Sequence, residues 1–202
     1  MPDWTFDPRV GAYRDPAGQA RDLAAVRRAF DLRIEASRES MRGHARDLAA
    51  GRIDAKAFEQ RMRDDIRRIH VEGRVLGVGG REMATSSDYG KTGNAIKQEY
   101  RYLSGFVQDI EDGRHTPAGI EARASKYAGA NAIQEFEAGR LGVMTEAGYT
   151  QARRVAVGDA GTCDTCRTHA AAGWVALDEV APIGDDQCQS NCRCVIEFRR
   201  AA

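Results

Sequence analysis

The sequence predicts a mainly α-helical protein, in which a helical body of about four helices precedes a small C-terminal module of α+β or all-β structure. Apolar residues recur at steps of three or four through most of residues 17–148, which is typical of amphipathic helices. All five cysteines lie among the last forty of the 202 residues, where short alternating segments replace the helical pattern. We therefore expect an extended N-terminal arm at 1–16, a helical domain at 17–148 and a cysteine-rich module at 149–202.

The composition limits the classes of function. Lys and Arg total 30, as do Asp and Glu, so no whole-chain basic field attracts nucleic acid or an anionic membrane. The apolar runs are only a few residues long, and the amino terminus lacks the basic flank and apolar stretch of a secretory signal. We expect a protein without membrane contact, made in a reducing compartment where cysteines bind metal more often than they pair.

The N-terminal third predicts the arm and two helices. Prolines and glycine interrupt residues 1–16, and we expect this arm to lie on another surface, such as a second subunit. A long helix is predicted from about residue 17 to 50, and Asp54 is a plausible N-cap for the next one. The inward positions of these two antiparallel helices are Leu23, Val26, Phe30, Ile34, Met41, Ala45 and Leu48, then Phe58, Met62, Ile66 and Ile69.

Glycines separate these helices from the rest of the body. The Gly-rich stretch 73–93 predicts a long loop, followed by a third helix at about 94–112. Thr116-Pro117 predicts the start of a fourth helix, which ends near Gly139 or Gly142. The aromatic residues of this region are expected to form bundle core: Tyr100, Tyr102, Phe106, Tyr127 and Phe136.

The C-terminal module carries the cysteines. Short strands are predicted near 153–157, 174–177 and 194–198, with apolar content too thin to fold without support. The cysteines form a Cys-x-x-Cys pair and, after 21 residues, a returning Cys-x-x-x-Cys-x-Cys segment: Cys163, Cys166, Cys188, Cys192 and Cys194. A tight pair met by a returning segment is typical of a tetrahedral thiolate site that holds a structural Zn²⁺. The module is therefore expected to be zinc-knuckle-like, with the metal supplying folding free energy.

Four ligand positions leave one cysteine spare. We favour Cys163, Cys166, Cys188 and Cys192, with Cys194 facing the small core. The alternative uses Cys194 and frees Cys188, and His169 is a weaker candidate. An iron–sulfur cluster needs the same ligands, so spacing leaves it open. A redox role is disfavoured, because no strand-then-helix context is predicted around the first pair and Asp164 between the thiols opposes thiolate formation.

The order of these motifs resembles the end of the phage head morphogenesis proteins (Mu F-like minor head proteins). That family shows a Cys-x-x-Cys, a Gly-x-Val-x-x-Leu-Asp-like segment and His-Pro-x-Cys-Arg-Cys before a strand. This chain has the first at Cys163, the second as Gly173-Trp-Val-Ala-Leu-Asp178 and the third as 189–194, Gln-Ser-Asn-Cys-Arg-Cys. Gln189 and Ser190 replace the family's His-Pro, and we infer that Cys188 takes over the ligand role of that histidine.

The resemblance implies a minor structural protein of the virion that acts in head assembly. It would be made in the host cytoplasm, contact portal or capsid proteins, and be oligomeric in the assembly. No motif of an enzyme is present, since Gly90-Lys91-Thr92 lacks the preceding glycine of a phosphate-binding loop. The alternative function is a nucleic-acid-binding zinc module, with DNA as the partner.

Overall fold

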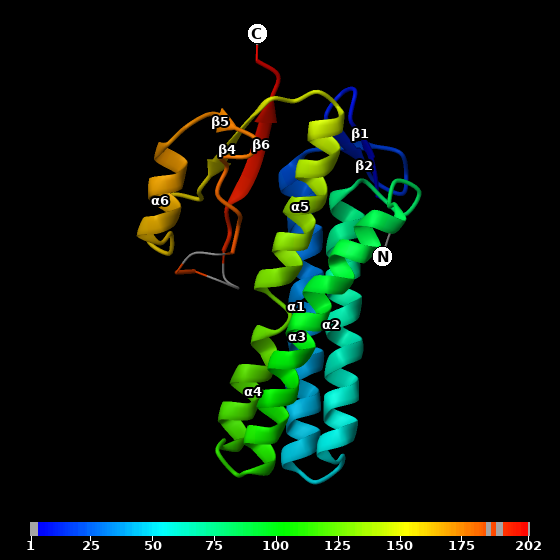
Figure 1. Cartoon of the computed structure of the whole chain (residues 1–202), viewed down its shortest axis with the longest axis vertical. Coiled ribbons are helices and arrows are strands. Elements are labelled where there is room, and N and C mark those ends of the chain that lie inside the picture. The colour runs from blue at the N-terminus through cyan, green and yellow to red at the C-terminus, as the bar shows by residue number, and fades with distance from the viewer. Residues whose placement is uncertain (1–3, 185–186, 189–191, 202) are drawn as a thin grey trace.

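A computed structural model describes residues 4–184, 187–188 and 192–201, and of Ala130 it describes the backbone alone. Long helices run side by side along the molecule, and the cysteine-rich module packs near one end of this bundle (Figure 1). The body contains α1 (Leu23–Ala49), α2 (Ala55–Gly77), α3 (Ser86–Glu111), α4 (Pro117–Lys126) and α5 (Ala130–Glu146). The predicted fold class, mainly helical with a small C-terminal sheet, is confirmed. Within the described part of the chain, no helix combines the length and apolar character that crossing a bilayer requires.

The first two helices follow their sequence signals. The side chain of Asp22 accepts a hydrogen bond from the Ala25 amide at 2.7 Å, and Asp54 caps α2 in the same way through Ala57. Nearly all the predicted inward positions of both helices are buried. The first helix begins at residue 23, because the preceding residues belong to a strand.

The prediction of an extended N-terminal arm was wrong. Residues 5–21 form an antiparallel three-stranded sheet of β1 (Thr5–Asp7), β2 (Ala12–Arg14) and β3 (Ala20–Arg21). Phe6 and Tyr13 are buried with ring centroids 4.7 Å apart, and the Phe6 amide donates to the Gly79 carbonyl at 3.0 Å. The segment therefore forms a small sheet that packs on its own chain, in place of an extended arm on another surface.

The predicted extent of the Gly-rich loop, 73–93, was also wrong, because the connection between α2 and α3 covers only residues 78–85. A side chain at Gly73 would place its Cβ 2.5 Å from the Ala132 carbonyl oxygen, and one at Gly77 would overlap the Phe136 carbonyl. These glycines lie inside α2 because α5 packs directly against them. The third helix begins eight residues earlier than predicted, at a Thr85–Asp88 capping box.

The predicted fourth helix is two helices, α4 and α5, separated at residues 127–129. The aromatic cluster is divided as well. Phe106 lies in a core at the α4 end of the bundle, whereas Phe136 lies in the core beside the module. Tyr102 is 56% exposed, so its assignment to the core was wrong.

The C-terminal sheet has the strand order β5-β4-β6 and is antiparallel throughout. Its strands are β4 (Gln151–Val155), β5 (Val175–Ala176) and β6 (Val195–Arg199), each overlapping a predicted strand. Ala152 and Ile196 belong to the same buried cluster as Phe30 and Phe136 of the helices. The module and the adjoining half of the helical body therefore share one hydrophobic core.

Candidate metal centre

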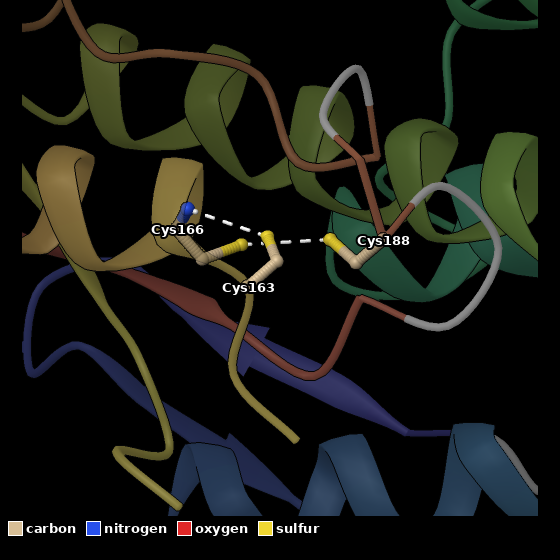
Figure 2. A group of neighbouring side chains, drawn as sticks. All are labelled: Cys163, Cys166 and Cys188. Carbon is tan, nitrogen blue, oxygen red and sulfur yellow. Dashed lines mark hydrogen bonds between the residues drawn. The ribbon is translucent and has the colours of Figure 1, made fainter. Parts of the chain in front are cut away.

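Two segments of the module bring the cysteines together. Cys163 is the N-cap of the short helix α6 (Asp164–Ala171), and its sulfur accepts a hydrogen bond from the Cys166 amide at 3.4 Å. Figure 2 shows the sulfurs of Cys163 and Cys166 at the start of α6, with Cys188 reaching toward them from the returning chain. Cys192 and Cys194 precede β6 and approach from the same returning chain.

The distances between the sulfur atoms fit a shared ion. Cys166 Sγ lies 3.5 Å from Cys188 Sγ and 3.9 Å from Cys192 Sγ. A zinc–sulfur bond of about 2.3 Å in tetrahedral geometry separates neighbouring sulfurs by about 3.8 Å. The described residues contain two groups whose sulfurs all lie within 4.8 Å of one another, and Cys166 belongs to both. These groups are Cys163, Cys166 and Cys188, and Cys166, Cys192 and Cys194.

The five cysteines enclose little space. All five line one cavity of about 10 Å³. A cavity of that size is close to the volume of one water-sized sphere. Cys166, Cys192 and Cys194 are buried, whereas Cys163 and Cys188 are partly exposed. The centre is therefore large enough for a single ion and lies where the buried core meets the surface of the module.

The thiols share protons unevenly, which lowers the pKa of Cys163 and Cys192 and raises the pKa of Cys166, Cys188 and Cys194. A hydrogen bond from the Cys194 thiol lowers the pKa of Cys192 to about 4, and the same interaction raises the pKa of Cys194. The Cys166 backbone amide lowers the pKa of Cys163. A cation bound by these cysteines would replace the shared protons, since only the deprotonated thiolate is a metal ligand.

Arginines surround the centre, and sequence reasoning did not anticipate them. The Arg154 guanidinium lies 3.8 Å from Cys192 Sγ and donates to the Pro182 carbonyl at 3.1 Å. Arg193 forms two hydrogen bonds of 2.7 and 2.5 Å with Asp159, which lower the pKa of this carboxyl to about 2. Arg27 contacts the same segment from α1. No local motif marks these residues, because their partners are distant in sequence.

The structure brings together all five cysteines that spacing predicted as ligands, and they could hold a metal ion. Cys194 is buried, as the favoured assignment expected, yet it also lies within one of the two ligand groups. Gln189 and Ser190 lie outside the described residues. The expectation that no strand-then-helix context surrounds the first cysteine pair was wrong, because β4 precedes the pair and α6 begins at Asp164.

Comparison with known proteins identified no relative. No family model matches the chain, and neither a curated protein nor a solved structure matches it.

Proposed function

We propose that the five-cysteine cluster holds one structural Zn²⁺ ion that stabilises the C-terminal module. The supporting observation is the cavity of about 10 Å³ lined by all five cysteines, with sulfur separations of 3.5 and 3.9 Å. A set of only thiolate ligands at this spacing suits zinc. An iron–sulfur cluster inserts several iron and sulfide atoms between its ligands and needs more space. The centre also leaves no room for a substrate beside the ion, which favours a role without catalysis.

We further propose that the chain is a minor structural protein of a phage-like particle, acting in head assembly through this module. The order of the cysteine motifs and the Gly173–Asp178 segment supports this assignment. The partners would be portal or capsid proteins, and the protein would be found in the virion.

Two measurements test this proposal. Protein purified under reducing conditions should contain about one zinc per chain by elemental analysis. A variant in which Cys163, Cys166, Cys188 and Cys192 are all replaced by serine should contain none. An affinity-tagged chain should recover portal or capsid protein from phage-infected cells. Absence of zinc from the wild type would refute the metal assignment, and particles that lack the chain at every stage of assembly would refute the viral role.

A second candidate function is nucleic-acid binding, and one surface of the module favours it. Arg153 and Arg199 lie over the Trp174 ring at 4.7 and 4.5 Å, and Arg200 lies over Tyr149. Arginine and aromatic side chains together are typical of surfaces that bind single strands. Glu197 pairs with Arg153 and reduces the positive charge there. Salt-dependent binding of an oligonucleotide that Trp174→Ala abolishes would support this candidate, and no binding at low salt would exclude it.

A further inference from the structure

Arg27 is a buried arginine whose side chain crosses from the helical body to the metal-site segment. Its Nη1 donates to the Cys194 carbonyl and its Nη2 donates to the Cys192 carbonyl, each at 2.9 Å. Both hydrogen bonds are buried, and the residue is only 6% exposed. One guanidinium on α1 thus holds the backbone of two cysteines that lie 165 and 167 positions later in the chain.

The guanidinium plane is fixed by a third hydrogen bond. Arg27 Nε donates to Asp31 Oδ1 at 2.9 Å, one turn further along α1. Three bonds in one plane use the rigid fork of arginine, which the single ammonium of lysine does not reproduce. The residue between the two cysteines, Arg193, is held from another direction through its bonds to Asp159. The Cys192–Cys194 backbone is therefore restrained on two sides.

We propose that Arg27 is a positioning residue of the metal centre, so that the helical body sets the metal affinity of the module. This inference rests on the proposed metal site. A ligand segment that is free before binding loses backbone entropy when the ion fixes it, and restraint before binding removes that cost. Holding both carbonyls keeps Cys192 Sγ at 3.9 Å from Cys166 Sγ, which is within the range a shared ion requires.

The test uses the full-length protein and three variants. Arg27→Met removes the fork, Arg27→Lys keeps the charge without the fork, and Arg28→Met alters an exposed neighbour on the same helix as a control. The zinc dissociation constant is measured under reducing conditions by competition with a chromophoric chelator. We expect weakening of about 10–100-fold for Arg27→Met, as for other residues that orient metal ligands. Arg27→Lys should lose most of the same affinity, and Arg28→Met should stay within about twofold of wild type.

Cobalt absorption gives a second readout that general destabilisation would not change. The bands of Co²⁺ bound to thiolates report ligand geometry, so the Arg27→Met spectrum should differ from that of wild type, whereas that of Arg28→Met should not. If Arg27→Met does not fold, Arg27→Lys and Asp31→Asn carry the test, the latter with a smaller expected loss. Wild-type zinc affinity and an unchanged cobalt spectrum in either Arg27 variant would overturn the inference. A wild-type protein that binds neither metal would instead refute the proposed metal site.

Discussion

Zinc binding is predicted to stabilise the helical body together with the module. Cys166, Cys192 and Cys194 lie in one continuous buried cluster with Phe30 and Phe136, so opening the centre disturbs the packing of α1 and α5. At free zinc 100 times the dissociation constant, binding adds about 2.7 kcal/mol to the free energy of unfolding. For a chain of this size, about 1 kcal/mol moves the melting temperature by about 2–4 °C. The expected rise is therefore about 5–11 °C relative to metal-free protein.

The assay follows thermal unfolding with two probes at buffered free zinc concentrations. Circular dichroism at 222 nm reports the helices, and fluorescence reports Trp174 of the module once Trp4, the other of the two tryptophans, is replaced by Phe. We expect both transitions to rise together with zinc, and neither to respond in the variant lacking four cysteines. A zinc-dependent shift of the Trp174 transition with an unchanged helical transition would refute the shared-core reasoning.

Three further predictions concern single residues. Cys166→Ser should weaken zinc binding, measured by chelator competition, more than Cys194→Ser, because only Cys166 belongs to both ligand groups; equal losses would contradict this. Glu135→Gln should lower the free energy of unfolding in urea by about 3–5 kcal/mol, because it leaves buried Arg74, 2.8 Å away, without its counter-charge; a loss below about 1 kcal/mol would refute it. The free energy of unfolding should fall by about 3 kcal/mol as pH drops from 6.5 to 4, because burial lowers the pKa of His70 to about 4 and only the unfolded chain can then protonate this ring. The variant His70→Phe should reduce this pH dependence, and an unchanged dependence would exclude His70 as its source.

Some helix boundaries could be predicted from the sequence, and others could not. Helices α1 and α2 could be predicted because each carries its own apolar period and its own capping aspartate. The end of α2 could not be placed in the same way, because Gly73 and Gly77 resemble helix terminators in sequence. Their actual role is the close approach of α5, which depends on a contact with residues about sixty positions away. The Thr85–Asp88 capping box was a local signal that would have placed the start of α3 correctly.

The cysteine cluster could likewise be predicted from short local motifs, whereas the charged residues around it could not. Spacing predicted the five sulfurs because metal ligands come in short motifs, but nothing in those motifs identifies the charges around them. Arg27, Arg140 and Arg154 are buried, as is Glu137, whose carboxyl interacts with Arg140, Arg27 and Cys192. The Arg154 guanidinium lies 3.8 Å from Cys192 Sγ, so positive charge stands directly beside the ligands. Four thiolates around a divalent cation carry two negative charges, which neighbouring guanidinium groups stabilise. The interface between body and module is thus electrostatically suited to a loaded centre.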